Sequence, residues 1–187
     1  WPASYRIMGH WRLTSQFDIA RLLGYDFVLQ VDDDSEFPRR VEERVFDRME
    51  AQGIKLAGRA AFPESHEVAI GLPELAKYFL VTEQLEPSPL LYQHCTPANI
   101  SGLFSDTKNV GIGWDRTMLY GNFVVYRTSF IFEPMVQRFI RLVVQSGGHF
   151  RYRWNEQTTF AMMWHLFLRD GEWALFDFPY RHGVVDS

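Results

Sequence analysis

One short segment constrains this chain more than any other, because an apolar strand runs directly into three consecutive aspartates, Asp32–Asp34. In the preceding residues 25–31, Phe27, Leu29 and Val31 alternate with other side chains, which predicts a strand with one apolar face. Aspartate disfavours strands, so we expect the triplet in a loop at the carboxyl end. Adjacent carboxylates repel one another unless positive charge lies nearby. A cation or a helix N-terminus should therefore face this tip.

The triplet admits two chemical interpretations. Asp32 and Asp34 alternate, so they could present hard oxygen ligands to Mg²⁺ or Mn²⁺, with a diphosphate supplying others. Alternatively, the acids precede a helix that begins at Pro38 and are stabilised by its dipole, at about 0.3–1 kcal/mol per charge. Taken alone, the triplet favours the second interpretation, because short acidic motifs occur in many unrelated sequences.

Hydrophobic periodicity predicts helices that alternate with short strands. Gly24, Gly53 and the run 146–148 suit helix ends, and Asn155 can cap the last helix. Residues 87–117 lack a sustained period and are expected to form an irregular functional loop region. The expected helices are 13–23, 38–52, 72–86, a stretch through 135–143, and 155–167; the expected strands are 25–31, 54–60, 122–127 and 173–178. This order predicts an α/β layer structure with a mixed sheet.

Composition excludes several classes of protein. With 187 residues, of which 47% are apolar and 16% aromatic, the chain can bury a sizeable core and is not disordered. Its formal charge is −4 and it has no Lys/Arg-rich run, so no nucleic-acid partner is expected. No apolar run is long enough for a membrane span, and no membrane contact is expected from this segment itself. The single Cys95 cannot form an internal disulfide.

Two further places in the sequence could carry chemistry. His182 lies in a turn beyond the last strand, and its imidazole could join the acids around Mn²⁺, although a lone histidine there is more often a partly exposed terminal residue. Trp154 and Glu156 place an indole beside a carboxylate at a helix start, which suits a sugar ring and its hydroxyls. Glu156 could orient or deprotonate an acceptor hydroxyl. A first-turn acid beside a core tryptophan would explain the same pattern.

Five segments stand in an informative order: Tyr5–Met8, residues 25–34, Asn122–Val124, residues 147–156 and Phe176–His182. Their arrangement resembles the fungal α-1,2-mannosyltransferases of glycosyltransferase family 15. The corresponding family motifs are Tyr-Arg-x-Met, a segment ending in Val-Glu-Pro-Asp, an Asn-Phe-Glu strand, Gly-Gly-Phe-Tyr-Glu-Arg-Trp-Gly-Asp, and a terminal Phe-Phe-x-Asp-Ile-Gly-Tyr-x-His. The resemblance extends over nearly the whole chain, and residues 87–117 are the least comparable part.

The resemblance implies a GT-A-like fold, with a mixed sheet flanked by helices. It implies one domain over residues 1–187, as a fragment of a longer chain that lacks part of the N-terminal nucleotide-binding half. It further implies a retaining, Mn²⁺-dependent mannosyltransferase. Such an enzyme moves mannose from a nucleotide-sugar donor, GDP-mannose in characterised members, to a glycan or glycoprotein hydroxyl, and it works in the Golgi or secretory-pathway lumen.

The resemblance also implies roles for individual residues. Asp34 and His182 would bind the metal, and Asp32 would assist at the metal or at the donor sugar. Glu156 would act at the acceptor hydroxyl. The remaining expected contacts are Tyr5, Arg6 and Asn122 for the donor, and Trp154 and Tyr120 for the acceptor.

Two positions depart from the family pattern. The carboxylate proposed as the family nucleophile falls at Val124, and the arginine before Glu-Pro-Asp falls at Gln30. Valine cannot attack an anomeric carbon, so retention would need same-face attack assisted by the leaving phosphate, or a different carboxylate. The change at Gln30 leaves the donor open. A non-catalytic carbohydrate-binding or scaffold domain is therefore an alternative. A metal-dependent phosphodiester or sugar-phosphate hydrolase is a weaker one, since it normally requires more clustered ligands.

Overall fold

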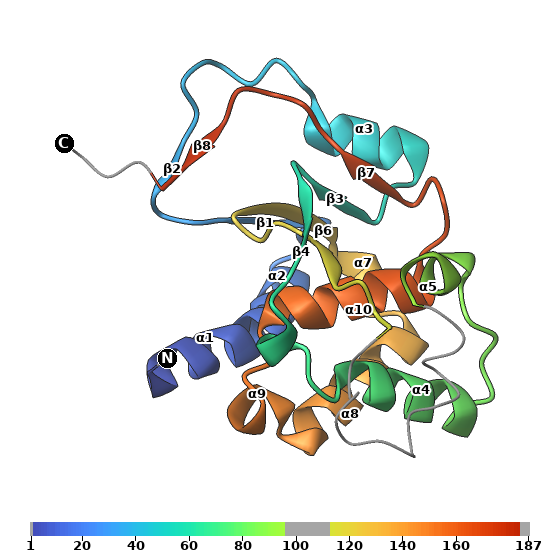
Figure 1. Cartoon of the computed structure of the whole chain (residues 1–187). Helices are drawn as coiled ribbons and strands as arrows, with labels where there is room; N and C mark the ends of the chain where they lie inside the picture. Colours follow the sequence, from blue (N-terminus) through green and yellow to red (C-terminus); the bar gives the residue numbers. More distant parts are fainter. Residues whose placement is uncertain (1, 96–112, 184–187) are drawn as a thin grey trace.

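The computed structural model describes residues 2–95 and 113–183, and a four-stranded mixed sheet lies at its centre (Figure 1). The strand order is β1-β6-β3-β7, which places β1 at one edge. Strand β6 (Phe123–Arg127) pairs antiparallel with β1 (Phe27–Val31) and with β3 (Leu56–Gly58). Strand β3 runs parallel to β7 (Trp173–Leu175). The predicted mixed sheet is confirmed.

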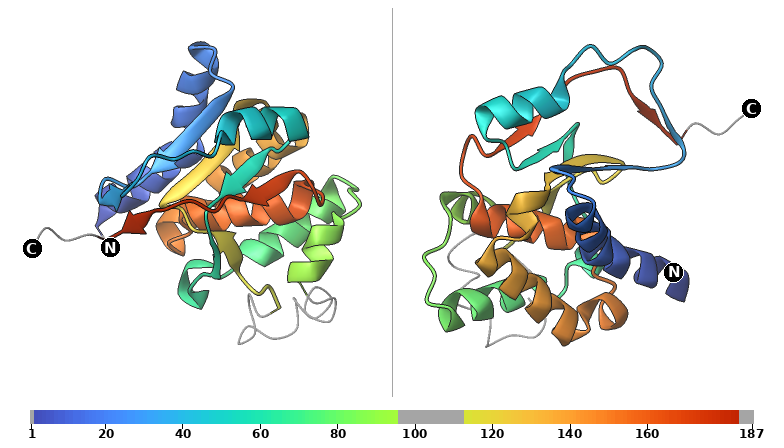
Figure 2. Two further views of the ribbon diagram at one scale, coloured as in Figure 1. Left: turned by 90° about the horizontal axis from the view of Figure 1, so that it is seen from above. Right: turned by 180° about the vertical axis from the view of Figure 1, so that it is seen from behind.

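Helix α10 (Glu156–Phe167) lies against one face of the sheet and has ten of its twelve residues buried (Figures 1 and 2). The buried side chains of α10 and of the helices around it form the larger of two hydrophobic cores. No helix in the described ranges has both the length and the apolar character of a membrane span. The surrounding elements are α1 (Ala3–Leu13), α2 (Ser15–Leu22), α4 (Leu72–Thr82), α5 (Pro89–His94), α7 (Thr128–Ile131), α8 (Pro134–Ser146), α9 (Gly148–Arg151) and the 3₁₀ helix η1 (His66–Val68).

The other face of the sheet is covered by helix α3 (Val45–Gln52) and by the chain that follows β7 (Figure 1). Val45 and Met49 of α3 pack with Phe123, Phe176 and Phe178 in a second, smaller core. Two further pairs of short strands lie outside the main sheet. They join β2 (Ser35–Glu36) to β8 (Arg181–His182), and β4 (Ala61–Pro63) to β5 (Thr117–Leu119).

Several helix ends follow the sequence signals. Gly53 and Gly147 adopt left-handed φ values of 68° and 67° where α3 and α8 end, a conformation that glycine reaches without steric cost. Asn155 caps α10, because its side-chain oxygen accepts the backbone N–H of Thr158 at 2.7 Å. The predicted caps and the helix at 155–167 are therefore confirmed.

Other predicted elements are wrong or incomplete. The helix expected from Pro38 begins only at Val45, because residues 38–44 are mostly charged and Val41 is the one aliphatic side chain among them that packs against the smaller core. Helix α1 was not expected. The strand expected at 54–60 is shortened to β3, with β4 beginning just after the expected range, and the strand expected at 173–178 ends at Leu175. The region expected to be irregular contains α5 and the first residue of β5, while 96–112 lie outside the described residues.

Trp154 belongs to the core rather than to an exposed sugar-binding surface. Its side chain is 4% exposed, and its indole N–H donates to the carbonyl oxygen of Ile70 at 2.6 Å. The six-membered ring lies against Gly148 in α9. The expectation that Trp154 offers a stacking face to an acceptor sugar is therefore corrected, because its ring is used for packing inside the protein.

His165, the single histidine of α10, is completely buried. Its Nδ1 accepts the indole N–H of Trp114 at 3.0 Å, and its ring stacks on His94 with a centroid separation of 4.0 Å. His94 in turn lies 2.8 Å from a carboxylate oxygen of Asp115. Burial, reinforced by His94, holds the pKa of His165 well below its ordinary value. The folded protein thus keeps this imidazole neutral.

We expect Gly148→Ala to destabilise the fold, although alanine normally favours a helix. A Cβ atom at this position would lie 2.1 Å from the ring of Trp154, which Ile70 holds in place. Overpacking costs about 1–3 kcal/mol, whereas replacing a helical glycine gains about 0.5–1 kcal/mol. Urea unfolding measures the balance, and the same substitution should cost less in a Trp154→Leu background. A single variant as stable as the wild type would contradict this packing.

We also expect stability to fall as the pH drops below about 6.5, the ordinary pKa of histidine. Between that value and the lowered pKa of folded His165, the unfolded chain binds a proton that the folded chain does not, so acid favours unfolding. The urea midpoint at pH 7 and pH 5 measures the loss. His165→Gln, which can still accept from Trp114, should reduce the difference between the two midpoints. If the midpoints at pH 7 and pH 5 differ as much in His165→Gln as in the wild type, groups other than His165 cause the acid sensitivity.

Candidate metal centre

The acidic triplet and the C-terminal turn meet because β2 and β8 pair antiparallel, with Ser35 opposite His182 (Figure 1). The Nε2 atom of His182 lies 3.0 Å from Oδ1 of Asp34 and 3.4 Å from Oδ2 of Asp32. Two segments from opposite ends of the described chain thus form one cluster. The interpretation of the triplet as acids at the start of a Pro38 helix is wrong, since α3 begins at Val45.

The donor set of this cluster suits a divalent cation. One ligand atom each from Asp32, Asp34 and His182 lie within 4.8 Å of one another. Two carboxylate oxygens and one imidazole nitrogen are a combination that Mn²⁺ accepts. The side chains are 28%, 47% and 27% exposed respectively, so additional ligands from water or phosphate could approach. Within residues 2–95 and 113–183, this is the only grouping of three such side chains with ligand spacing.

A set of hydrogen bonds fixes the acidic loop to the turn before β6. The backbone N–H of Asp32 donates to the carbonyl oxygen of Asn122 at 3.3 Å. The hydroxyl of Tyr180 donates to the same oxygen at 2.7 Å and lies 2.6 Å from the Ser35 hydroxyl. Burial raises the pKa of Tyr180 despite the Ser35 contact, and the nearby carboxylates add to the effect, so the phenol remains a donor. Asn122 is buried and takes part through its backbone.

Arg12 of α1 connects this cluster to the N-terminus of α10. Its guanidinium donates from NH2 to Oδ1 of Asp32 at 3.4 Å, and from NH1 to Oε1 of Glu156 at 2.9 Å. Burial opposes the charged form, but the two carboxylates outweigh it and raise the pKa of Arg12. Sequence reasoning missed this residue, because the Tyr-Arg-x-Met motif ends before it and a single helical arginine carries no signal of its own.

Glu156 does not lie where an acceptor hydroxyl could reach it in this structure. Its side chain is 1% exposed, and Oε1 is engaged by Arg12. The expected role at the acceptor is therefore corrected, because the carboxylate is enclosed between α1 and α10. Tyr5 lies close enough for the Glu156 charge to act on it, since burial and then that charge raise the pKa of the Tyr5 phenol.

The other expected contacts divide between the cluster and the scaffold. The Tyr120 hydroxyl lies 3.5 Å from Nδ1 of His182, with its ring edge toward the imidazole. The Arg6 guanidinium donates to the Phe150 carbonyl oxygen in α9, so it ties two helices together. The structure therefore brings Tyr120 to the metal ligands, whereas it uses Arg6 and Trp154 for packing and anchoring.

The two departures from the family pattern are cross-strand partners. Gln30 of β1 stands directly opposite Val124 of β6, and both are buried. The Gln30 amide donates to the carbonyl oxygen of Gly121 at 3.1 Å. Neither side chain presents a carboxylate or a guanidinium at this point of the sheet.

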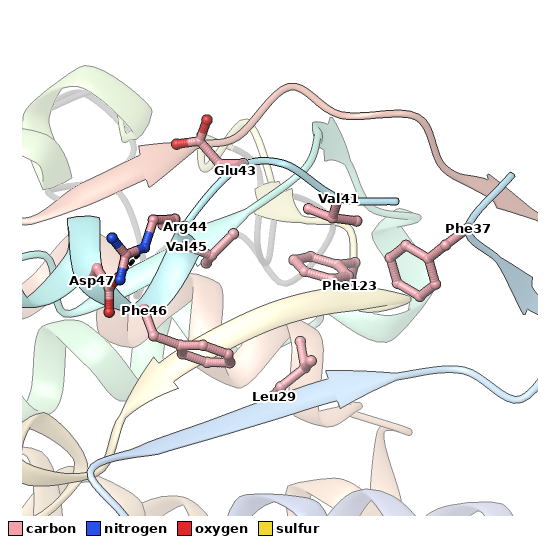
Figure 3. A pocket seen from close by; sticks show the side chains of 9 residues that line it. All are labelled: Leu29, Phe37, Val41, Glu43, Arg44, Val45, Phe46, Asp47 and Phe123. Atoms are coloured by element: carbon pink, nitrogen blue, oxygen red, sulfur yellow. Dashed lines mark ion pairs between the residues drawn. The ribbon is translucent and has the colours of Figure 1, made fainter. Parts of the chain in front are cut away.

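A separate apolar cavity of about 430 Å³ lies on the α3 side of the sheet (Figure 3). Its walls include Leu29, Phe46 and Phe123, from β1, α3 and β6. None of the site residues expected from the sequence lines it. The cluster at the end of β1 is thus distinct from this cavity.

No family model and no curated protein matches this sequence. Among solved structures, core-mannan synthase A (CmsA/Ktr4) from Aspergillus fumigatus, in an Mn/GDP form, has a TM-score of 0.77 and 19% identity over 96% of this chain and 48% of its own. The mannosyltransferase Ktr4p from S. cerevisiae in complex with GDP has a TM-score of 0.78 and 16% identity, covering 96% and 45%. A further structure of Ktr4p from S. cerevisiae has a TM-score of 0.78 and 17% identity, and the match covers 96% of this chain and 46% of that one.

These likenesses show the class of fold. The chain has the α/β fold of fungal mannosyltransferases, and the predicted GT-A-like mixed sheet flanked by helices is confirmed. The chain spans slightly less than half the length of the solved structures that it matches.

We expect Arg12→Met to destabilise the protein strongly, because Glu156 would remain buried without the guanidinium that now pairs with it. Removing one partner of a buried ion pair typically costs about 3–5 kcal/mol. The double variant Arg12→Met/Glu156→Gln buries no charge at this point and should recover much of the loss. Urea unfolding at neutral pH compares the variants. A single variant with wild-type stability would show that Glu156 does not depend on Arg12.

Proposed function

We propose that this chain is the metal-binding part of an Mn²⁺-dependent glycosyltransferase domain, which transfers a sugar from a nucleotide-sugar donor to a hydroxyl of a glycan or glycoprotein. The observation that carries the proposal is the convergence of Asp32, Asp34 and His182 at the end of β1. The fold supports it, since the similar proteins of known structure are mannosyltransferases described with GDP, one of them also with Mn.

In this proposal Asp34 and His182 hold the cation, and Asp32 assists at the metal or the donor. A bound divalent cation would neutralise the negative charge that develops on the leaving diphosphate. Tyr120 would orient the His182 ring through Nδ1, which leaves Nε2 facing the acids. Asn122 and Tyr180 would hold the acidic loop in place through the hydrogen bonds that they share.

The finer points of the proposal rest on the family resemblance. They are mannose as the sugar, GDP-mannose as the donor, retention of anomeric configuration, and the Golgi or secretory-pathway lumen as the compartment. Because position 124 is a buried valine, retention would need attack on the same face of the sugar assisted by the leaving phosphate, or a different carboxylate. Tyr5 remains the candidate for the donor side.

A non-catalytic carbohydrate-binding or scaffold domain is the second candidate. Val124 is buried in β6, and Glu156 is enclosed and paired with Arg12. Neither the position of the family nucleophile nor the acid expected at the acceptor hydroxyl therefore offers an open carboxylate here. Such a module should bind sugar without metal or nucleotide, whereas the enzyme should bind nucleotide only with metal present. Calorimetric titration with and without Mn²⁺ separates these outcomes.

We expect Asp34→Ala to weaken Mn²⁺ binding by more than about 10-fold, which is the loss that even outer partners of a metal ligand produce. The melting temperature should change little, because the Asp34 side chain is 47% exposed and belongs to neither core. Asp33→Ala is the matched control, since it removes the same charge next to the ligand and Asp33 lies outside the cluster. Calorimetry measures both. If Asp34→Ala and Asp33→Ala bind Mn²⁺ with equal affinity, Asp34 is not a metal ligand.

Turnover is the direct test of the enzyme proposal. A donor screen with a chain extended upstream of Trp1 should yield a glycosylated product, and NMR of that product gives the anomeric configuration. Asp34→Ala should abolish turnover, while Asp33→Ala should retain it. Unchanged turnover in Asp34→Ala would reject the proposed metal chemistry, and an inverted product would reject retention alone.

A further inference from the structure

Glu156 and Asp32 share one guanidinium, and their surroundings differ sharply. Arg12 contacts Asp32, a metal-ligand candidate that is 28% exposed, and Glu156, which is 1% exposed. The hydrogen bond to Glu156 is the shorter of the two, at 2.9 Å against 3.4 Å. A charge-assisted hydrogen bond is stronger away from water, so Glu156 is the principal partner of Arg12.

Glu156 is placed between two residues of α1 that lie on the same helix face. Gly9 and Arg12 are three positions apart, so both point toward α10. Oε1 faces Arg12, while Oε2 lies where a Cβ atom on Gly9 would approach it to 3.1 Å. Oε2 is buried and makes no hydrogen bond to the described residues. Among the described residues, the side-chain hydrogen bond of this carboxylate is the one that it accepts from Arg12.

The net charge that Asp32 presents to a cation depends on how Arg12 is shared between Asp32 and Glu156. Arg12 contacts both carboxylates, and the more closely it pairs with Asp32, the less available that carboxylate is to a cation. With Glu156 present, the guanidinium is drawn toward the interior, and Asp32 keeps Oδ2 on the side of His182. Without the Glu156 charge, Arg12 would pair with Asp32 alone and would compete with a metal ion for it.

We propose that Glu156 is a positioning residue that sets the metal affinity of the Asp32–Asp34–His182 cluster by taking the shorter hydrogen bond of Arg12 and so weakening the pairing of Arg12 with Asp32. The inference rests on the proposed function, because it assumes that the cluster binds a divalent cation. It replaces the expected contact between Glu156 and an acceptor hydroxyl with a contact that acts through Arg12.

The experiment titrates Mn²⁺ into four proteins by calorimetry. Glu156→Gln keeps the shape of the side chain and should weaken Mn²⁺ binding by about 10-fold, the scale on which outer partners act on metal sites. Arg12→Met/Glu156→Gln removes the competing guanidinium as well and should return the affinity to near the wild-type value. Glu172→Gln is the control. It removes the same charge as Glu156→Gln, but Glu172 pairs with Lys55 at the opposite end of the sheet from the cluster.

Each outcome is decisive. If Mn²⁺ does not bind the wild type, the proposed function fails and this inference fails with it. If Mn²⁺ binds the wild type and Glu156→Gln equally, the inference alone is overturned. It is also overturned if the double variant stays as weak as Glu156→Gln, because Glu156 would then act without Arg12.

A second variant guards against instability of Glu156→Gln. Gly9→Ala changes no charge, but its Cβ would lie 3.1 Å from Oε2 and would displace the carboxylate relative to Arg12. We expect weaker Mn²⁺ binding in this variant too. An unchanged affinity together with a retained fold, measured by circular dichroism, would count against the positioning role.

Discussion

Charge compensation at the end of β1 is the constraint on which the site depends. Three carboxylates follow one another where the strand ends, and their repulsion has to be offset by groups from elsewhere in the fold. The structure brings the Arg12 guanidinium of α1 to Asp32, and it places the His182 imidazole of β8 3.0 Å from Asp34. The packing of α1 against α10 is therefore an electrostatic as well as a structural requirement.

Local signals in the sequence predicted the sheet and the helix caps, because those features depend on nearby residues. The β1 alternation, the cap at Asn155 and the glycines after α3 and α8 are of this kind. The helix expected from Pro38 was wrong for a related reason. A proline can open a helix, but residues 38–44 carry few apolar side chains, and the helix forms only where Val45 and Met49 reach the sheet.

The site was harder to predict, because its contacts join distant parts of the chain. The prediction that Asp34 and His182 meet relied mainly on the resemblance of the motif order to that of a known family, and the structure brings the two residues together. The role of Arg12 had no sequence signal. The burial of Glu156 and Trp154 could not be read from their neighbours, because aromatic-plus-acid pairs occur both in cores and in sugar sites.

The candidate metal ligands and the residues that support them come from several elements of this chain. The acids follow β1, the imidazole comes from β8, and the loop is held by the turn before β6. By contrast, the departures at Gln30 and Val124 lie side by side within the sheet and are buried. The acidic cluster and this part of the sheet are therefore formed by different side chains. The two places are nevertheless linked, because the Gln30 amide donates to the carbonyl oxygen of Gly121, and the next residue, Asn122, accepts the Asp32 N–H that holds the acidic loop.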